Sequence, residues 1–410
     1  MIQRNIIRNL AEAMADTPVV LVHGARQTGK STLVKAYAET VSGGRYVTLD
    51  DATVLAAATE DPAGFLSRFE GAVILDEVQR APGLFGAIKL AVDRDRQPGR
   101  FLLTGSADVL LLPNLSESLA GRMEILTLWP FAGTELAGND RSFVDALFRE
   151  GPMPAVSSAE PRRALMERII TGGFPEAVAR DSARRRNAWF GSYITTILQR
   201  DVRELSNIEH LTLLPRLLSM LAARAASLLN HAELSRAVGL PLSTLKRYMA
   251  LLETTFLVRQ LPSWSTNLGK RLVKSPKVML CDTGLMAYLL GVDSGDAVPD
   301  HVVGALVENY AAMELTKHLG WSDTRAGLYH FRERTGKEVD MLLEDAAGHV
   351  VGIEVKASGS VSKNDLKHLH FLREQLGDRF LRGVVLYAGT ESVSFDEKLE
   401  AVPLGVLSGK

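Results

Sequence analysis

The most constraining feature of this chain is a glycine-rich segment placed between an apolar run and a helix-like stretch. Val19–Ser31 reads VVLVHGARQTGKS, which contains the spacing G-x-x-x-x-G-K-S. The run Val19–Val22 suits a buried strand, and Thr32–Glu39 suits a helix. Strand, loop and helix in this order are the context that a phosphate-binding loop requires. The segment therefore predicts an α/β fold with an anion site after its first strand.

The chemistry of the loop explains its spacing. Glycines at two positions let the backbone turn tightly with no Cβ in the way. Successive N–H groups around Gln27–Ser31 can then point inward at a helix N-terminus. Lys30 can reach the β- and γ-phosphates, and the Ser31 hydroxyl is an oxygen ligand that suits Mg²⁺. The predicted nucleotide-binding residues are Gly24, Gln27, Thr28, Gly29, Lys30, Ser31 and Thr32.

A second motif consists of an apolar strand that ends in two acids. Ala72–Glu77 reads AVILDE. In nucleotide hydrolases the first acid, here Asp76, holds Mg²⁺ at the end of a strand, and we expect that strand beside the loop strand. The second acid, Glu77, is placed to orient and deprotonate the attacking water. The alternative is a strand end followed by a solvated helix cap.

A third strand and a following helix supply two further candidates. Arg100–Thr104 reads RFLLT, and a hydroxyl at its tip, Thr104 or Ser106, could sense the γ-phosphate; an ordinary strand-end turn is the alternative. Asn114–Arg122 has the pattern of a helix that ends at a glycine. Arg122 could be an arginine finger that reaches the γ-phosphate of a neighbouring chain, which would imply an oligomer. It could equally complement the dipole of its own helix.

Composition sets the class of protein. The chain has 410 residues and a formal net charge of −1, which indicates two or three domains and confines any nucleic-acid site to a local patch. The single cysteine, Cys281, is interpreted as a core residue and excludes a cysteine-rich metal site. No apolar run approaches the ~20 residues that span a bilayer, and the N-terminus carries charges where a signal peptide is apolar. We expect a cytoplasmic protein with no membrane partner.

Three regions follow from the pattern: residues 1–185, 186–292 and 293–410. In the first, strands alternate with helices, which predicts a P-loop parallel sheet with crossover helices. One of these strands falls between the two nucleotide motifs, as in the subclass of hydrolases with a glutamate base. The strand candidates are Val19–Val22, Arg45–Leu49, Ala72–Leu75, Arg100–Leu103 and Glu124–Leu128.

The middle region has the pattern of a helical winged-helix domain. Asn230 caps a helix over His231–Val238, a short turn follows, and a second helix runs from Leu242 to about Glu253. Phe256–Leu261 and Val278–Leu280 could form a wing hairpin. Such a surface would bind a DNA or RNA backbone, or it could dock a protein or act as a lid. The segment from His231 to Leu280 contains two acidic residues and eight basic residues, and the basic ones are Arg236, Lys246, Arg247, Arg259, Lys270, Arg271, Lys274 and Lys277.

The last region contains a predicted β-hairpin with carboxylates on one face. Val339–Glu344 and Val350–Ala357 are apolar strands, and a three-residue loop at Ala346–Gly348 would place Asp340 opposite Glu354. Lys356 shares that face because it lies two residues beyond Glu354.

Two carboxylates this close repel each other unless a cation joins them. Mg²⁺ or Mn²⁺ could join Asp340 and Glu354, and Lys356 could position a water for phosphodiester cleavage. Glu308, on a preceding helix over Gly304–Leu315, could add a third carboxylate. The alternative is an Asp340–Lys356 salt bridge on an exposed sheet face.

Taken together, these regions resemble the bacterial and archaeal ATPases of the AAA superfamily that join an N-terminal nucleotide-binding domain to a C-terminal domain of unassigned function. The resemblance is looser through Phe131–Ile170. The matching stretches are GARQTGKSTL (24–33), VILDEVQRAP (73–82), LLTGSAD (102–108), SLAGR (118–122), GGFPE (172–176), RDV (200–202), KRLVKSPKVMLCDTGL (270–285), EVDMLLED (338–345) and IEVKAS (353–358).

The resemblance implies ATP binding with Mg²⁺, ATP hydrolysis, a winged-helix middle and a restriction-endonuclease-like C-terminal α/β domain. By motif match, Lys30 and Ser31 contact phosphate and Mg²⁺, Asp76 holds the metal, and Glu77 is the hydrolytic base. Two functions compete: an ATP-driven protein acting on nucleic acid with a metal-dependent nuclease, and a regulatory or docking ATPase whose last domain is an interaction surface. A phosphotransferase is a third, weaker hypothesis. The residues at nuclease-type positions are Glu308, Asp340, Glu354 and Lys356.

Overall fold

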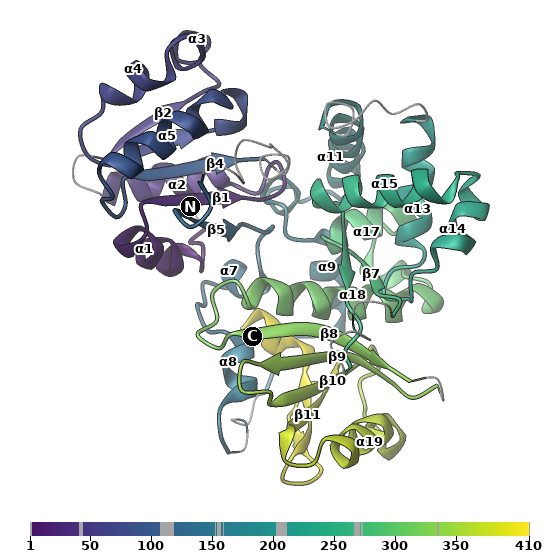
Figure 1. Cartoon of the computed structure of the whole chain (residues 1–410). Helices are drawn as coiled ribbons and strands as arrows, with labels where there is room; N and C mark the ends of the chain where they lie inside the picture. Colours follow the sequence, from purple (N-terminus) through teal and green to yellow (C-terminus); the bar gives the residue numbers. More distant parts are fainter. Residues whose placement is uncertain are drawn as a thin grey trace. The chain divides into compact units, whose positions relative to one another are not determined.

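A computed structural model describes residues 2–40, 44–106, 119–151, 153, 157–158, 160–201, 211–265, 271, 274–333 and 336–409. The chain forms two compact units, which are described separately (Figure 1). One contains Arg4–Pro130 with Thr254–Phe256, and the other contains Met1–Gln3, Phe131–Glu253 and Leu257–Lys410. The expected domain boundaries near residues 185 and 292 stay predictions.

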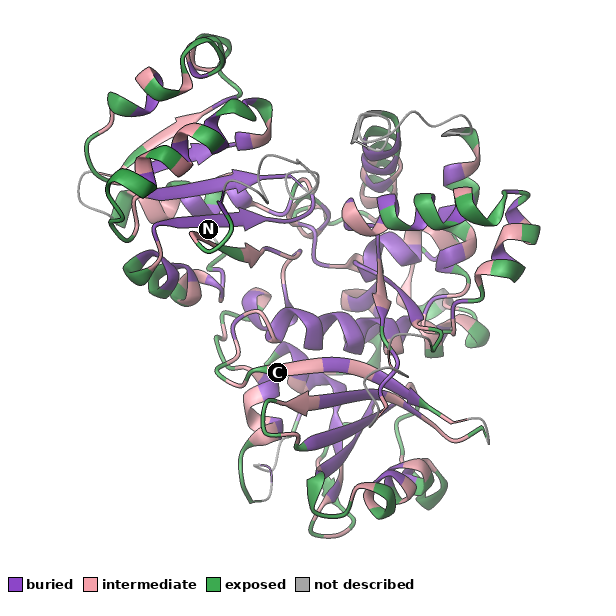
Figure 2. Ribbon diagram, in the orientation of Figure 1, coloured by how far each residue is buried: buried purple, intermediate pink, exposed green. Residues whose placement is uncertain are grey.

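The N-terminal unit is built on a five-stranded parallel sheet with strand order β2-β3-β4-β1-β5. This confirms the parallel α/β fold expected from the alternating apolar runs. Strands β1, β3 and β4 are buried along their whole length, as in a sheet with both faces covered (Figure 2). The strands are β1 (Val19–His23), β2 (Arg45–Thr48), β3 (Val73–Asp76), β4 (Phe101–Gly105) and β5 (Met123–Thr127).

Alternate residues of these strands enter two cores. Val19 and Leu21 pack with the residues of α3, α4 and α5, whereas Val20 and Val22 pack with those of α1 and α2. The period of two places successive side chains on opposite faces. The helices are α1 (Ile7–Asp16), α2 (Lys30–Thr40), α3 (Ala52–Glu60), α4 (Pro62–Ser67) and α5 (Gly83–Arg94), with a 3-10 turn at Val78–Arg80.

One detail of the sheet differs from expectation. The strand that ends in Asp76 was expected beside the loop strand, but β4 lies between β3 and β1. The nucleotide motifs therefore sit on strands separated by one position, and β4 brings Thr104 between them. Helix α2, which starts at Lys30, contacts both β3 and β4 and so spans this gap.

In the other unit, contacts between Asp282 and the GGFPE turn (172–176) hold the first helices together. Asp282 is buried, caps α17 by accepting from Leu285 N (3.0 Å), and also accepts from Gly173 N (2.7 Å). A Cβ on Gly172 would lie 2.2 Å from Asp282 Oδ1, so the GGFPE turn needs glycine there. The helices are α7 (Gly133–Leu136), α8 (Phe143–Phe148), α9 (Arg162–Thr171), α10 (Pro175–Val178), α11 (Ala183–Thr196), α13 (Leu214–Ala222) and α17 (Thr283–Leu290).

The predicted helix pair and hairpin of the middle region are present. Asn230 caps α14 (His231–Val238) by accepting from Glu233 N, and Gly239 ends the helix in the left-handed region at φ 80°. Helix α15 covers Leu242–Thr254. Strands β6 (Val258–Leu261) and β7 (Lys277–Leu280) pair antiparallel. Cys281 is a core residue, as expected.

The C-terminal part is a mixed six-stranded sheet with strand order β12-β13-β11-β10-β9-β8. The pairs β10–β11 and β11–β13 are parallel and the others antiparallel. Helix α18 (Asp300–His318) contacts β10, and α19 (Lys367–Leu376) contacts β9, β10 and β11. The strands are β8 (Ala326–Arg332), β9 (Glu338–Asp345), β10 (Val350–Lys356), β11 (Phe380–Tyr387), β12 (Val393–Ser394) and β13 (Leu399–Pro403).

Short turns complete the second unit. A π-helical turn at Ile197–Asp201 continues α11, and 3-10 turns occur at Leu211–Leu213, Gly295–Ala297, Lys363–Leu366, Gly377–Arg379 and Leu404–Ser408. Within the part of the chain that the structure describes, no helix combines the length and the apolar character needed to cross a membrane.

His318 makes the fold sensitive to acid. Its Nδ1 accepts from Phe143 N (2.9 Å), and burial lowers the pKa of His318 to about 4. Between about pH 6.5 and pH 4 the unfolded chain binds a proton here that the folded chain does not, so stability is present above this window and falls as pH drops through it. We expect this residue to cost up to about 1.4 kcal/mol of unfolding free energy per pH unit.

His318→Gln keeps an acceptor for Phe143 N without an imidazole to protonate. Urea denaturation at pH 7 and pH 5 should show a smaller loss between the two values in this variant than in the natural chain. His370→Gln, at an exposed histidine of α19, serves as the control. Equal losses in all three proteins would contradict the assignment.

Candidate functional site

The glycine-rich loop has the backbone that its sequence predicts. Gly24 (φ 156°) and Gly29 (φ 91°) adopt positive φ, and Gln27 lies in the left-handed region at φ 63°. A Cβ on Gly24 would lie 2.2 Å from the carbonyl oxygen of Leu128, so only glycine allows this approach. The loop ends where α2 begins, at Lys30, which places its N–H groups at a helix N-terminus.

Lys30 lies inside the loop rather than in solvent. Its Nζ donates to Gly24 O (3.1 Å) and Ala25 O (2.9 Å), and the residue is only 5% exposed. Thr28 is buried and its hydroxyl also donates to Ala25 O (2.9 Å). The ammonium is thus held over the loop by two carbonyl oxygens, which a phosphate could replace as its partner.

Asp76 is the point at which three elements converge. Its Oδ1 accepts from Ser31 Oγ (3.0 Å) of α2 and from Thr104 Oγ1 of β4, and its Oδ2 accepts from Tyr46 Oη (2.6 Å) of β2. A carboxylate beside the hydroxyl of Ser31 provides the hard oxygen ligands that Mg²⁺ prefers. The donors present therefore fit the metal that the motif requires.

Glu77 occupies a strained position next to this carboxylate. It is a non-glycine residue in the left-handed region at φ 61°, which is costly and concentrates at functional sites. Its N–H donates to Thr104 Oγ1 (3.0 Å), and its Oε2 accepts from Gln79 Nε2 (2.5 Å). Gln79 Nε2 also donates to Ser106 Oγ (2.9 Å), so the two sensor candidates both belong to the Glu77 network.

His23 adds a neutral group at the end of β1. Its Nε2 lies 2.9 Å from Thr127 Oγ1. Burial and then the positive charge of Lys30 lower the pKa of His23 to about 4. The imidazole is therefore uncharged near neutral pH and does not compete with Lys30 for a phosphate.

The remaining nucleotide candidates lie at the edge of this network. Gln27 and Thr32 are exposed, so their contribution to a ligand would come mainly from the backbone of the loop. The expected helix over Asn114–Arg122 falls largely outside the described residues. Arg122 itself forms an ion pair with Asp93 of α5 (2.6 Å). Its role as an arginine finger stays a prediction.

The C-terminal hairpin has the predicted register. Val350 pairs with Glu344 and Ile353 with Met341, and the turn closes through Asp345 N to His349 O (3.1 Å). Continued by one residue, this register places Asp340 opposite Glu354. Asp340 Oδ2 accepts from Val355 N (2.9 Å), which fixes the carboxylate beside β10.

Glu354 is buried, whereas the alternative interpretation required an exposed sheet face. The residue is 4% exposed, and its Oε2 accepts from Lys356 Nζ (3.1 Å). In place of the Asp340–Lys356 salt bridge of that alternative, Lys356 pairs with Glu354. Burial, followed by the negative charge of Asp340, raises the pKa of Glu354.

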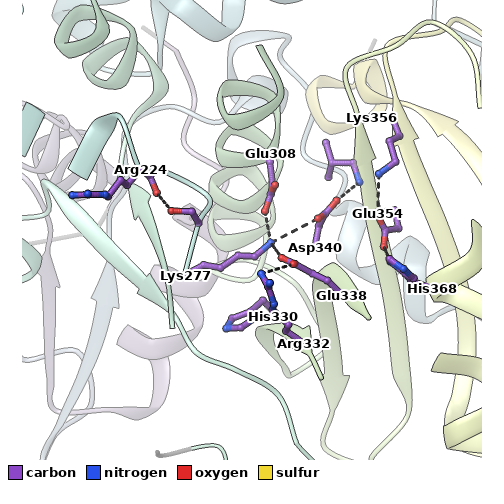
Figure 3. Close-up of polar contacts among 12 residues, drawn as sticks. Arg224, Lys277, Glu308, His330, Arg332, Glu338, Asp340, Glu354, Lys356 and His368 are labelled. Carbon is purple, nitrogen blue, oxygen red and sulfur yellow. Dashed lines mark hydrogen bonds and ion pairs between the residues drawn. The ribbon is translucent and has the colours of Figure 1, made fainter. Parts of the chain in front are cut away.

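Lys277 of β7 enters the same region from the middle part of the chain (Figure 3). Its Nζ lies 2.7 Å from Glu308 Oε1, 2.9 Å from Glu338 Oε1 and 3.7 Å from Asp340 Oδ1. The Lys277 side chain is 2% exposed. We call Lys277, Glu308, Glu338 and Asp340 the Lys277 cluster.

The charges of the cluster depend on one another. Burial and then Asp340 raise the pKa of Glu308, although Lys277 opposes this. Burial also acts to raise the pKa of Glu338, but the Lys277 ammonium lowers it overall. Across the described residues, no group of three or more His, Cys, Asp or Glu side chains is arranged to hold a metal ion. In this conformation an ammonium supplies the positive charge that the carboxylates need.

This geometry reduces the number of basic residues that are available to bind a nucleic-acid backbone. Two of the eight are engaged with acids of the C-terminal sheet: Lys277 in the cluster, and Arg271 through paired contacts with Glu344 (2.7 and 3.1 Å). They neutralise protein carboxylates instead of facing a phosphate backbone.

Three residues of these networks were not predicted in these roles. The sequence around Tyr46 indicates only a strand. Its contact with Asp76 could not be predicted, because it depends on β2 lying beside β3. Gln79 lies two residues after Glu77, so its closeness in sequence was the only available hint. Lys277 was counted as a surface cation, and no local pattern places it among acids more than thirty residues away.

Comparison with known sequences agrees with this arrangement. A model of the AAA domain matches residues 16–137. Two further models, both described as domains of unknown function, match residues 162–296 (DUF8612) and 303–407 (DUF4143). The parallel sheet, the loop and the Asp76 network define the class: a P-loop protein with an N-terminal AAA domain, a module that generally binds ATP and Mg²⁺.

Two mycobacterial proteins identify the family of this chain. It is 32% identical over 407 residues to the uncharacterized protein Rv2008c of Mycobacterium tuberculosis, covering 98% of this chain and 83% of the relative. The Mycobacterium bovis protein Mb2031c gives the same values. The chain belongs to the same family as these mycobacterial proteins. An uncharacterized protein of Haemophilus influenzae is 23% identical over 232 residues, 53% of this chain and 52% of that protein.

Two solved structures are distantly similar to this chain. A point variant of Thermotoga maritima RuvB matches with a TM-score of 0.32 and 17% identity, over 63% of this chain and 89% of that chain. The Saccharomyces cerevisiae Hsp104–ADP complex matches with a TM-score of 0.26 and 16% identity, over 78% and 48%. These TM-scores are too low for the similarity to indicate a function.

Tyr46→Phe tests whether the β2 hydroxyl orients Asp76. Without this donor the carboxylate loses a partner that fixes its position, so nucleotide affinity in the presence of Mg²⁺ should fall by roughly 10-fold. Affinity in EDTA should change little, because the phosphate contacts remain. Titration of a fluorescent ATP analogue with and without Mg²⁺ measures both values. Tyr37→Phe on α2 is the control, and equal losses in Mg²⁺ and EDTA would refute the positioning role.

Proposed function

We propose that this protein binds ATP with Mg²⁺ and hydrolyses it. The observation that supports this most is the convergence of the Ser31 hydroxyl on Asp76 at 3.0 Å, with Glu77 the next residue along the chain. A phosphate loop alone would be compatible with binding. A loop serine, a strand-end acid and a second acid in one network are the parts that hydrolysis requires.

Each residue has a defined task in this proposal. Lys30 leaves the carbonyls of Gly24 and Ala25 for the β- and γ-phosphates, and the loop N–H groups hold the phosphate oxygens. Ser31 and Asp76 would hold Mg²⁺, which neutralises phosphate charge when bound.

Glu77 orients a water for attack and accepts its proton. Its carboxylate accepts from Gln79, which also contacts Ser106. A hydroxyl network that links Glu77, Thr104 and Asp76 gives the base and the metal-holding acid a common frame. Transfer to a substrate other than water is less favoured, because a carboxylate base beside the metal acid is suited to a water nucleophile.

The pair Glu77→Gln and Lys30→Ala separates hydrolysis from binding. Glu77→Gln should retain ATP but lose turnover by about 10²–10⁴-fold, because the amide cannot accept the proton. Lys30→Ala should lose ATP binding itself. Phosphate release and calorimetric titration with Mg²⁺–ATP measure the two effects.

Asp50→Asn is a suitable control, since Asp50 lies after β2 and pairs with the surface residue Arg80 (2.7 Å). Unchanged turnover in Glu77→Gln would remove this residue as the base. A natural chain that releases no heat with millimolar Mg²⁺–ATP would overturn the whole proposal.

A second candidate function is metal-dependent phosphodiester cleavage by the C-terminal domain, driven by the ATPase. The observation that favours it is the hairpin register, which places Asp340 opposite Glu354 with Lys356 beside them. This is the arrangement expected for a restriction-endonuclease-like core. The competing proposal is a regulatory ATPase whose C-terminal domain serves only as an interaction surface.

Asp340→Ala tests the cleavage proposal. Plasmid, linear and single-stranded DNA are incubated with the chain and Mg²⁺ or Mn²⁺, with and without ATP. We expect the natural chain to cut at least one substrate and Asp340→Ala to lose this activity, because a metal-holding carboxylate is gone. Asp345→Ala, at the hairpin turn, is the control. Cutting that persists in Asp340→Ala, or no cutting at all, removes the nuclease proposal.

A further inference from the structure

Arg4 lies outside both nucleotide motifs, yet it contacts the phosphate loop. It is 9% exposed, its Nη1 donates to Thr28 O (3.2 Å), and its Nη2 donates to Trp129 O (2.5 Å). Thr28 belongs to the loop, and Trp129 follows Leu128, whose carbonyl would meet a side chain at Gly24. The guanidinium therefore joins the loop to the segment that follows β5.

Both ends of this bridge are anchored within the N-terminal unit. The carbonyl oxygen of Arg4 accepts from Ile7 N (3.1 Å) at the start of α1, and Leu10 of α1 is buried in the core that lies against the sheet. The Trp129 ring lies against the ring of Phe256, with centroids 5.1 Å apart, and Phe256 belongs to the same unit. Because both anchors are packed, the guanidinium has little freedom to leave Thr28.

The contact with Thr28 O orients the amide of the next residue. In a trans peptide the C=O and N–H bonds point in opposite directions, so a donor on Thr28 O directs Gly29 N–H to the other side. Gly29 adopts φ 91°, and a Cβ there would meet no atom of the described residues within 4 Å. Glycine is thus needed at this position for the direction of the backbone rather than for space, and its freedom makes an external constraint on the peptide useful.

Two further loop carbonyls are held by side chains of the loop itself. Lys30 Nζ donates to Gly24 O and Ala25 O, and the Thr28 hydroxyl donates to Ala25 O. In the proposed function, Lys30 exchanges these carbonyls for phosphate oxygens. Arg4 differs because it approaches from outside the loop, so it can keep Thr28 O as its partner when a phosphate binds.

We propose that Arg4 is a positioning residue of the nucleotide site, which holds the Thr28–Gly29 peptide so that Gly29 N–H faces the phosphates. The inference rests on the proposed function and adds to it a residue that neither motif contains. Arg4 acts through the loop, so its effect falls on phosphate binding and not on Mg²⁺ or on the attacking water. Loss of Arg4 weakens affinity with and without Mg²⁺, whereas Tyr46→Phe is expected to weaken it only with Mg²⁺.

Arg4→Met removes the donors and keeps an unbranched side chain. Affinity for ATP and for inorganic tripolyphosphate should fall by the same factor, roughly 10-fold, in Mg²⁺ and in EDTA, because one aimed N–H is lost from the phosphate site. KM for ATP should rise, and kcat should change less than KM. Calorimetric titration measures the affinities, and phosphate release measures the two kinetic constants.

Arg8→Met is the matched control, because Arg8 is exposed on α1 and pairs with Glu12 of the same helix (3.7 Å). It removes the same charge from the same end of the chain, so it should bind both ligands as the natural chain does. Equal losses in Arg8→Met and Arg4→Met would indicate an effect of charge alone and overturn the positioning role. A loss confined to ATP would assign Arg4 to the base or ribose and would also overturn it, as would unchanged affinity in Arg4→Met.

A second measurement begins with the natural chain and does not depend on whether the variant folds. Labelling with carbonyl-¹³C threonine and ¹⁵N glycine restricts the NMR spectrum to amides of Thr–Gly pairs, which include Gly29. The Gly29 N–H signal should move downfield when saturating tripolyphosphate accepts its hydrogen bond, and folded Arg4→Met should lack this shift. A natural chain that binds tripolyphosphate without the shift would overturn this inference alone. A natural chain that binds neither ligand would remove the proposed function as well.

Discussion

The carboxylate of Asp76 is the interaction on which the nucleotide site depends. Hydroxyls from α2, β2 and β4 meet on it, so one side chain fixes the positions of the loop serine, the neighbouring strand and the strand between the two motifs. This convergence is possible because β4 is inserted between β1 and β3. The insertion moves the acid one strand away from the loop and fills the gap with Thr104. The same threonine accepts the N–H of Glu77, so one hydroxyl holds the backbone of Glu77 and also donates to the carboxylate of Asp76.

The second unit relies on a buried cation in a comparable way. Lys277 connects the β6–β7 hairpin to α18 and β9, and Arg271 and Glu344 form a further pair between the same regions. Truncation of one partner of a buried ion pair is costly because the other charge is left behind. The contacts between the middle region and the C-terminal sheet therefore include these ion pairs as well as the apolar packing of Trp264 against Phe331.

Local sequence patterns predicted the features that depend on local rules. The loop glycines, the strand-end acids, the Asn230 cap and the hairpin register all follow from spacing, propensity or turn length, and all are present in the structure. The strand order was not available from such rules, so Asp76 was placed beside the wrong strand. Tyr46 and Lys277 acquire their roles from elements that approach from elsewhere in the chain. A lysine in a basic stretch looks like a surface charge until the sheet that supplies its acids is known.

The close approach of Gly24 to Leu128 also ties the phosphate loop to the edge of the sheet. The carbonyl of Leu128 fills the space that a side chain at Gly24 would need, and Leu128 directly follows β5, the outermost strand on that side. Because an edge strand has a partner on one side only, it is free to open before the central strands do. Any opening of β5 would remove the wall against which the loop turns. A ligand that binds the loop only while β5 is paired would therefore also stabilise the pairing of this peripheral strand.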